Sequence, residues 1–209
     1  MIMSARNVAV ADYGASNLRS ICGALRDAGA TVKVVTSPSE LRGVSKVVVP
    51  GVGAFKSGMQ SLESTGLREE LARYWKTQSG VVLGICLGMQ LMFSRSTEGG
   101  VSQGLGVLEG SVDRLKVDPI THPLPHMGWN SVIISKKHPL VADLPEEFDA
   151  YFAHSYAVEP HDRESIVGQT EYGVQFPSII VSGNVMATQF HPEKSGRVGM
   201  QLLRNFVSL

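Results

Sequence analysis

The stretch Val81-Val82-Leu83-Gly84-Ile85-Cys86-Leu87-Gly88-Met89-Gln90-Leu91-Met92-Phe93 decides the fold of this chain. Its first three residues form a short apolar run, which is typical of a strand buried inside a sheet. After the segment Gly84-Ile85-Cys86-Leu87-Gly88, apolar residues recur at helical spacing. The stretch therefore predicts a strand, a sharp turn and a helix, with Cys86 at the turn.

Cys86 lies between two glycines, each two residues away. A nucleophile on a strand–turn–helix unit is a nucleophile elbow, a position that α/β-hydrolases fill with serine. Because the turn is sharp and strained, the residues that flank it need minimal side chains. Sulfur at the N-terminus of a helix is also favoured as the thiolate. A buried cysteine between two packing glycines is the alternative, and this stretch alone leaves both open.

The composition is that of an ordinary globular protein. The 209 residues are 43% hydrophobic and 18% charged, which suits a single domain over residues 1–209. Basic and acidic residues number 19 each, so nothing indicates a nucleic-acid-binding or membrane-surface patch. Cys22 and Cys86 are too few for a disulfide framework, and Cys22 lies on an apolar helical stripe as a core residue. Without a signal-peptide pattern or a bilayer-length apolar run, we expect a cytoplasmic protein.

Strand and helix patterns alternate through the first half of the chain. Helices are expected from about Asn17, Ser37 and Leu67. Strands are expected at residues 7–11, 31–35, 46–49 and 81–83. Repeated strand–helix units predict an α/β fold with a central, mostly parallel mixed sheet flanked by helices.

The second half of the chain has a different pattern. Residues 94–106 are polar and Gly-rich and are expected to form a loop, and residues 119–130 are expected to be irregular. A closing helix is expected at residues 195–207. Strands are expected at residues 107–117, 132–134, 151–157, 166–170, 179–181 and 185–188. Few helical patterns interrupt these strands, so this half is expected to be rich in antiparallel pairing.

A second Gly-rich turn, Pro50-Gly51-Val52-Gly53, follows the strand at residues 46–49. It is not a P-loop, because G-x-x-x-x-G-K-[ST] is absent. An oxyanion site needs backbone N–H groups aimed at developing negative charge, and glycine permits the required orientations. A simple tight turn is the alternative. Ligands bind at the carboxyl ends of parallel strands, so this turn and Cys86 are expected at one edge of the sheet.

His191 is the best candidate for the base that a cysteine nucleophile needs. It follows an apolar strand, and Glu193, two residues on, is the candidate acid that orients the imidazole. The proline between them is expected to keep the backbone extended, so that both side chains point the same way. The other histidines fall in loops and turns, except that His126 and His154 have more distinctive neighbours. The cysteines and histidines have no recognisable metal-ligand spacing, so no metal and no cofactor is expected.

Residues 84–90 together with His191-Pro192-Glu193 resemble the triad (class I) glutamine amidotransferases. The resemblance extends from about Val8 to the C-terminus. Within that family, the chain is most similar to the glutaminase subunits of imidazole glycerol phosphate synthase, from histidine biosynthesis. Four stretches support this branch: Asp12-Tyr13-Gly14-Ala15-Ser16-Asn17, Pro50-Gly51-Val52-Gly53-Ala54-Phe55, His126-Met127-Gly128-Trp129-Asn130 and His191-Pro192-Glu193-Lys194-Ser195.

The resemblance implies a role for each member of the triad. Cys86 would attack the side-chain amide carbon of glutamine, His191 would shuttle protons, and Glu193 would orient His191. A γ-glutamyl thioester would form, ammonia would leave, and water would release glutamate. The implied oxyanion donors are the N–H of Leu87 and one N–H from the Gly-rich turn, that of Val52 or Gly53. The positions that match glutamine-holding residues are Gly53, Gln90, Glu98, Ser155 and Tyr156.

The resemblance also implies a partner. Members of this branch deliver ammonia to a second subunit, a (β/α)8 barrel cyclase, within a heterodimer. The positions that match the interface are Asn17, Trp129, Tyr151 and Lys194. On residue chemistry alone, Trp129 would be an ordinary packing aromatic and Lys194 a solvated surface charge. Because glutamine hydrolysis without an acceptor wastes glutamine, we expect the Gly51–Val52 peptide to turn its N–H away until the cyclase docks.

Three other functions are considered. A triad glutaminase that serves pyridoxal phosphate synthesis is disfavoured by the stretch Met127-Gly128-Trp129-Asn130. A cysteine hydrolase or peptidase on a similar fold differs in its substrate, so activity assays separate it from a glutaminase. A regulatory module with a dead site is disfavoured because Cys86, His191 and Glu193 are all present.

Overall fold

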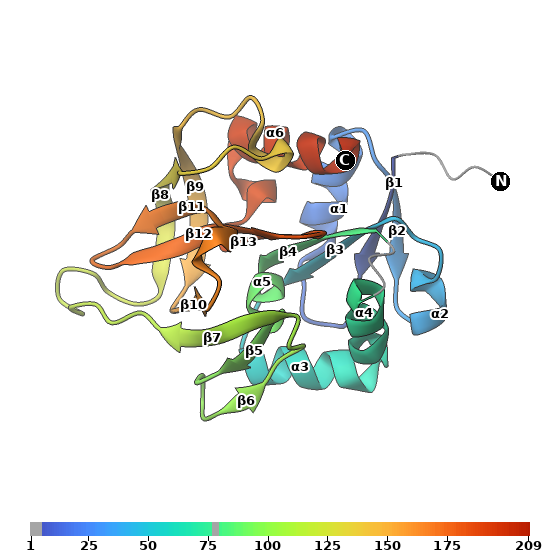
Figure 1. Ribbon diagram of the computed structural model, residues 1–209, viewed down its shortest axis with the longest axis horizontal. Helices are drawn as coiled ribbons and strands as arrows, with labels where there is room; N and C mark the ends of the chain where they lie inside the picture. The colour runs from blue at the N-terminus through green and yellow to red at the C-terminus, as the bar shows by residue number, and fades with distance from the viewer. Residues whose placement is uncertain (1–5, 77–79) are drawn as a thin grey trace.

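Two sheets form the framework of the molecule (Figure 1), a computed structural model that describes residues 6–76 and 80–209. The larger sheet has nine strands in the order β2-β1-β3-β4-β13-β12-β11-β8-β9. The smaller sheet has four strands in the order β10-β7-β5-β6. Helices cover both faces of the larger sheet, and the smaller sheet lies on the side of α3 and α5.

The first half of the larger sheet is parallel and alternates with helices, as expected. Its strands are β1 (Asn7–Ala11), β2 (Thr31–Val35), β3 (Lys46–Gly51), β4 (Val81–Cys86) and β13 (Val185–Thr188). Its helices are α1 (Leu18–Asp27), α2 (Pro38–Leu41), α3 (Phe55–Ser64), α4 (Leu67–Lys76) and α5 (Leu87–Leu91). The predicted α/β class is therefore confirmed, and the carboxyl ends of β3 and β4 lie side by side.

Helix α3 is an element that the sequence analysis did not predict. It begins at Phe55, directly after the Gly-rich turn, and buries Phe55, Gly58, Met59 and Leu62. Gly58 permits close approach to α5, since a Cβ there would lie 3.1 Å from the Leu87 Cδ2 atom. Tertiary packing against α5 therefore accounts for a helix whose own sequence contains three serines and a glycine.

The second half of the larger sheet is antiparallel. It comprises β8 (His126–Ile134), β9 (Glu147–His154), β11 (Ile166–Glu171) and β12 (Gln175–Ser182), which joins β13. The expectation that residues up to 130 are irregular is wrong for His126–Asn130. These residues pair with β9 from the His126–His154 position onward, so long-range pairing overrides the preceding prolines and the Gly128 backbone, with φ of 126°.

The smaller sheet occupies segments that were partly misassigned. Residues 94–106 were expected to form a loop, but β5 (Phe93–Ser96) and β6 (Ser102–Gln103) lie within or overlap this range. The expected strand at residues 151–157 is two strands in different sheets, because the chain leaves β9 and enters β10 (Tyr156–Pro160) after Ser155. With β7 (Leu108–Arg114), these strands form a largely polar outer sheet, which explains the weak apolar signal.

Two apolar layers enclose the parallel strands. Val8 and Val10 face the layer of α1 and α6 (Gly196–Ser208), whereas Ala9 and Ala11 face the layer of α3, α4 and α5. Cys22 is buried in the first layer, in agreement with its assignment to the core. Short 3₁₀ segments occur at Pro139–Val141, Arg163–Ser165 and Pro192–Lys194. Within residues 6–76 and 80–209, no helix is sufficiently long and apolar to span a membrane.

Candidate active site

Cys86 occupies the sharp turn that the sequence predicts. It is the last residue of β4 and directly precedes α5, with φ of 53° and ψ of −110°. A positive φ is strained for a residue with a side chain and persists only where the surroundings enforce it. Its side chain is buried, with 5% of the residue exposed. The chain therefore presents a single thiol on a strained elbow at the carboxyl edge of the sheet.

The two flanking glycines are required by close packing. A Cβ on Gly88 would overlap the Val49 carbonyl oxygen of the neighbouring strand β3. A Cβ on Gly84 would lie 2.7 Å from the Met92 Cε atom and 2.9 Å from the Met89 nitrogen. Backbone atoms block both positions, so the elbow can form only with glycine on each side.

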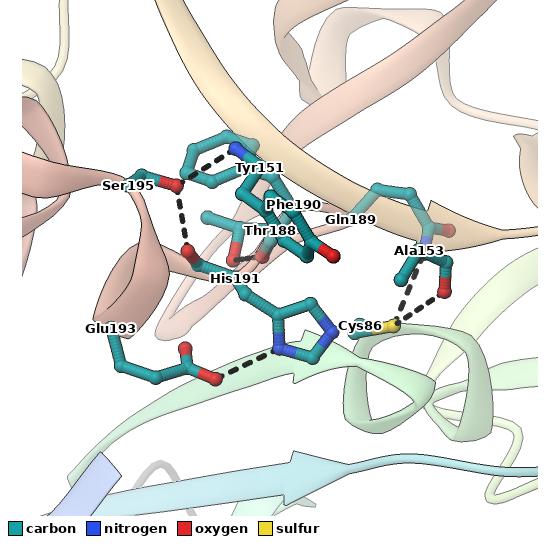
Figure 2. Close-up of polar contacts among 9 residues, drawn as sticks. All are labelled: Cys86, Tyr151, Ala153, Thr188, Gln189, Phe190, His191, Glu193 and Ser195. Carbon is teal, nitrogen blue, oxygen red and sulfur yellow. Dashed lines mark hydrogen bonds and ion pairs between the residues drawn. The ribbon is translucent and has the colours of Figure 1, made fainter. Parts of the chain in front are cut away.

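His191 and Glu193 form a buried pair beside the thiol (Figure 2). The His191 Nδ1 atom lies 2.8 Å from the Glu193 Oε1 atom, and the other ring nitrogen faces the Cys86 sulfur. Burial alone lowers the pKa of His191, but the hydrogen bonds to Cys86 and Glu193 outweigh it and raise this pKa to about 10. The three side chains predicted as a triad are therefore brought together, with His191 favoured as the imidazolium.

The backbone that joins His191 to Glu193 is not extended, so the expected reason for their proximity is wrong. Pro192–Lys194 forms a 3₁₀ turn. Ser195 holds this turn, because its hydroxyl donates to the His191 carbonyl oxygen at 2.6 Å and accepts from the Tyr151 N–H at 3.0 Å. The His191 N–H in turn donates to the Tyr151 carbonyl oxygen at 2.9 Å. Sequence reasoning did not find the role of Ser195, since its partners are on a distant strand.

The Gly-rich turn lies next to the elbow but does not aim every N–H at it. The Val52 N–H donates to the Ala15 carbonyl oxygen at 2.8 Å. The buried Tyr13 hydroxyl donates to the Pro50 carbonyl oxygen at 2.7 Å. Burial, and then the neighbouring Cys86 charge, raise the pKa of Tyr13 far above its ordinary value, so the hydroxyl remains a donor. Residues 13–15 therefore tether the turn in its present orientation.

The positions expected to hold glutamine lie on four segments: the Gly-rich turn, α5, the residues between β5 and β6, and the link from β9 to β10. Gln90 is buried on α5, and its Nε2 atom donates to the Tyr156 carbonyl oxygen at 2.9 Å and to Gln189 Oε1 at 3.1 Å. Glu98 accepts from the N–H of Phe55 at 2.6 Å, and Phe55 begins α3 two residues after Gly53. Ser155 links β9 to β10, and its carbonyl oxygen accepts from the Leu115 N–H.

Gln189 is a residue of the site that the sequence analysis missed. Its Nε2 atom donates to the Cys86 sulfur at 3.7 Å, and the sulfur lies 4.0 Å from the Ala153 carbonyl oxygen (Figure 2). Its position two residues before His191, beyond the last residue of β13, is the only signal that the sequence offers. The thiol sulfur therefore has an amide neighbour as well as the imidazole.

The four positions expected at a partner interface form a connected group beside the triad. Trp129 and Tyr151 are opposite each other on β8 and β9, with ring centroids 6.2 Å apart. The Lys194 Nζ atom lies 5.4 Å from the centroid of the Tyr151 ring. Lys194 and Asn17 then line one small hollow with Val52 and the triad residues His191 and Glu193. Trp129 is 59% exposed, so this group presents one large aromatic side chain to solvent.

In the part of the chain that the structure describes, no group of three or more His, Cys, Asp or Glu residues is arranged to hold a metal ion. The chemistry that this arrangement supports is nucleophilic attack by a thiolate with an imidazole as proton carrier.

Comparison with known proteins identifies the family. The model of the family "Glutamine amidotransferase class-I" matches residues 9–209. The chain belongs to the class-I glutamine amidotransferase family. This amidotransferase is therefore related over almost its full length to the family that residues 84–90 and His191–Glu193 indicated.

Relatives of this amidotransferase carry a more specific name. It is 45% identical over 199 residues to a Symbiobacterium thermophilum protein named imidazole glycerol phosphate synthase subunit HisH, covering 95% of this chain and 92% of that protein. It is 41% identical to a Campylobacter jejuni (strain RM1221) protein named imidazole glycerol phosphate synthase subunit HisH 1, covering 97% and 100% of the two chains. The predicted similarity to this branch of the amidotransferases is confirmed.

Solved structures support the fold of this amidotransferase. A crystal structure described as a glutamine amidotransferase superposes with a TM-score of 0.75 at 20% identity, covering 95% of this chain and 96% of that one. The structure of PurLQS from Thermotoga maritima also gives a TM-score of 0.75, at 17% identity, and covers 96% of each chain. The predicted amidotransferase-like fold is confirmed.

Proposed function

We propose that this amidotransferase is the glutaminase subunit of imidazole glycerol phosphate synthase, acting in the cytoplasm as one domain over residues 1–209. The observation that carries the proposal is the buried contact of Cys86 with His191 and of His191 with Glu193, in a chain of this family. The family description supports glutamine as the substrate, and the names of the relatives support a role as a subunit of imidazole glycerol phosphate synthase.

The reaction begins at the Cys86 sulfur. The thiolate attacks the side-chain amide carbon of glutamine, and the resulting oxyanion accepts hydrogen bonds from the Leu87 N–H and from Val52 or Gly53. The His191 imidazolium gives its proton to the leaving nitrogen, so ammonia departs and a γ-glutamyl thioester remains. His191 then takes a proton from water, which attacks the thioester and releases glutamate, regenerating the thiolate and the imidazolium.

Glu193 keeps His191 in the orientation that this exchange requires. It accepts from the Nδ1 atom, so the proton that moves is the one on Nε2, the atom that faces sulfur. Its negative charge also stabilises the imidazolium that protonates the leaving group. No metal or cofactor takes part in these steps.

Five positions would hold glutamine. Both hydrogens of the Gln90 amide are donated, to the Tyr156 carbonyl oxygen and to Gln189. A contact of Gln90 with the substrate glutamine would therefore be made by its Oε1 atom. Glu98 has one oxygen occupied by Phe55 and offers the other to the substrate ammonium. Gly53, Ser155 and Tyr156 complete the set around the elbow.

The cyclase subunit would dock over Asn17, Trp129, Tyr151 and Lys194. Exposed aromatic residues beside a reactive centre are typical of interaction surfaces. Val52 is 43% exposed and shares a hollow with Asn17 and Lys194, so docking would reach the oxyanion turn directly. In this proposal, docking breaks the Val52–Ala15 hydrogen bond and lets the Gly51–Val52 peptide turn its N–H toward the substrate.

The test measures glutamate production from glutamine by the chain alone, with the cyclase subunit, and with the cyclase and its nucleotide ligand. We expect low activity alone, a large rise in the full mixture and none with Cys86→Ala. Full activity of the isolated chain would remove the gating step but retain the glutaminase. Peptidase activity in place of glutaminase activity, or no activity in any mixture, would contradict the proposed function.

A further inference from the structure

Two buried histidines lie behind the elbow and take no part in the triad. His126 and His154 are opposite each other on β8 and β9, and His126 Nδ1 lies 3.0 Å from His154 Nε2. Aromatic rings surround them: the His126 ring stacks on Phe152 and Tyr172, and the His154 ring meets Phe176 edge to face. Buried polar rings in an apolar cluster require a complete set of hydrogen-bond partners.

The direction of each hydrogen bond in this pair follows from Asn130. Its Oδ1 atom accepts from the Ser131 N–H at 2.8 Å, so its Nδ2 atom is the donor to the Glu171 carbonyl oxygen and to His126 Nε2. His126 Nε2 therefore carries a lone pair, and its proton is on Nδ1, from where it is donated to His154. His154 in turn carries its proton on Nδ1 and donates it to the Tyr156 carbonyl oxygen at 2.9 Å.

The same carbonyl oxygen connects the pair to the nucleophile. It accepts a second hydrogen bond, from Gln90 Nε2. The other hydrogen of that amide goes to Gln189 Oε1, which turns the Gln189 Nε2 atom toward the Cys86 sulfur. One continuous path of hydrogen bonds thus leads from β8, through the Tyr156 carbonyl oxygen, to the thiol.

We propose that His154 is a positioning residue for the Cys86 thiolate. Held by His126, it fixes the Tyr156 carbonyl oxygen, which orients Gln90 and thereby the N–H that Gln189 donates to sulfur. The inference extends the proposed glutaminase site and rests on the role given there to Cys86. It adds a second support for the thiolate, distinct from the His191 imidazolium.

The electrostatics of the pair suit this role. Burial lowers the pKa of His126 to about 4. Burial, together with the charges of His126 and His191, lowers the pKa of His154 to about 3. Both rings are therefore neutral at neutral pH, and protonation of His126 Nε2 would place a donor against the Asn130 amide. The hydrogen bonds from His126 to His154 and from His154 to the Tyr156 carbonyl oxygen therefore keep their direction at neutral pH and above.

The test measures the rate of Cys86 alkylation by iodoacetamide as a function of pH, by mass spectrometry of the Cys86 peptide. Since only the thiolate reacts, the midpoint of this profile is the pKa of the thiol. We expect His154→Leu to raise the midpoint by about half a pH unit to one unit, as expected for a weakened hydrogen bond to a charged group. In His154→Asn, the amide nitrogen takes the place of Nδ1, so the midpoint should stay close to the wild-type value. His161→Leu, at an exposed histidine, leaves the profile unchanged.

A double variant separates positioning from a general loss of structure. Gln189→Met removes the amide N–H with little change in volume and should raise the midpoint as His154→Leu does. If both act through one path, the double variant shifts the midpoint no further than Gln189→Met alone. Additive shifts, or an unchanged profile in a folded His154→Leu protein, would overturn the inference.

A substitute is available if His154→Leu does not fold. His126→Phe keeps an aromatic ring between Phe152 and Tyr172 but removes the N–H that holds His154. It should raise the midpoint in the same direction, and an unchanged midpoint would overturn the inference. Alkylation needs neither glutamine nor the cyclase, so these results do not depend on whether the proposed function is correct.

Discussion

The Val52 N–H donates to the Ala15 carbonyl oxygen at 2.8 Å, so this candidate oxyanion donor is already occupied. The neighbouring peptide is tethered as well, by the hydroxyl of Tyr13 on the Pro50 carbonyl oxygen. Both tethers come from the loop between β1 and α1, which also carries the candidate interface residue Asn17. The loop is therefore suited to couple the docking surface to the oxyanion turn.

Removal of the Tyr13 tether should release the turn. We expect Tyr13→Phe to raise the glutaminase activity of the isolated chain about threefold to tenfold, since one buried hydrogen bond contributes about 1 kcal/mol to the tethered orientation. Activity in the cyclase complex should change little, because the turn is reorganised there in either case. Steady-state glutamate production checks both statements. Equal or lower activity of the isolated variant would contradict a tethering role.

The charge of Glu193 should matter more than its shape. Glu193→Gln keeps the side-chain volume but removes the negative charge beside His191 Nδ1. We expect the kcat of the complex to fall about 100-fold, because the imidazolium is no longer stabilised and the wrong tautomer is favoured. Glu164→Gln, at an exposed carboxylate paired with Lys136, is the matched control and should be neutral. A loss of less than threefold in Glu193→Gln would argue against an orienting carboxylate.

The buried histidines should make the fold sensitive to acid. The folded-state pKa values of His126 and His154 lie below the ordinary value, at about 4 and about 3. Their contribution to stability is therefore present above pH about 6.5 and is lost as pH falls toward the folded-state values. Urea unfolding at pH 7 and pH 5 should show a free-energy loss of about 1–2 kcal/mol per histidine. His154→Asn should reduce this loss; an unchanged loss in the variant would contradict the assignment.

His191 should make the fold less stable at alkaline pH, the opposite of the effect of His126 and His154. Its folded-state pKa is raised to about 10, so its stabilising contribution is full below pH about 6.5 and is lost as pH rises toward 10. Glu193→Gln removes one cause of the raised pKa, and its unfolding free energy should therefore decline less between pH 7 and pH 9. Parallel pH profiles for wild type and variant would contradict the assignment.

Trp129 should be a major contributor to partner binding but not to folding. Because it is 59% exposed, Trp129→Ala should leave the free energy of unfolding within about 0.5 kcal/mol of wild type. The same change should weaken cyclase binding at least about tenfold, the effect of losing an aromatic anchor. Calorimetric titration with the cyclase measures this affinity. Val34→Ala, on the edge strand β2 at the other end of the sheet, is the control and should bind like wild type. Equal affinities of wild type, Trp129→Ala and Val34→Ala would contradict a role of Trp129 in the interface.

The residues of the elbow could be predicted from sequence because their pattern is local. Gly84, Cys86 and Gly88 are two residues apart, and this spacing is visible in the sequence. A Cβ at Gly84 would meet the Met89 nitrogen within the elbow, and one at Gly88 would meet the backbone of the neighbouring strand β3. The strands β1, β3, β4 and β13 could also be predicted, because burial on both faces leaves uninterrupted apolar runs. Helix α3 was missed because the turn signal at residues 50–54 obscured its start and its packing partner is α5.

The rest of the site depends on contacts between distant segments. Gln189 acquires its role from Gln90 and Cys86, which lie 99 and 103 residues earlier. Ser195 holds the His191 turn through Tyr151, 44 residues away. The pairing of His126–Asn130 with β9 likewise brings two isolated histidines into one pair. No periodicity or local motif encodes such contacts, so they emerge only from the folded chain.

The most direct test follows the amide nitrogen of glutamine. The chain, the cyclase and the cyclase nucleotide substrate are combined with glutamine labelled at the amide with a heavy nitrogen isotope, in the presence of excess unlabelled ammonium. If this chain releases ammonia at Cys86 and passes it to the cyclase, the imidazole product carries the label, and Cys86→Ala abolishes its incorporation. Product that carries only unlabelled nitrogen, or labelled product from Cys86→Ala, would contradict the account.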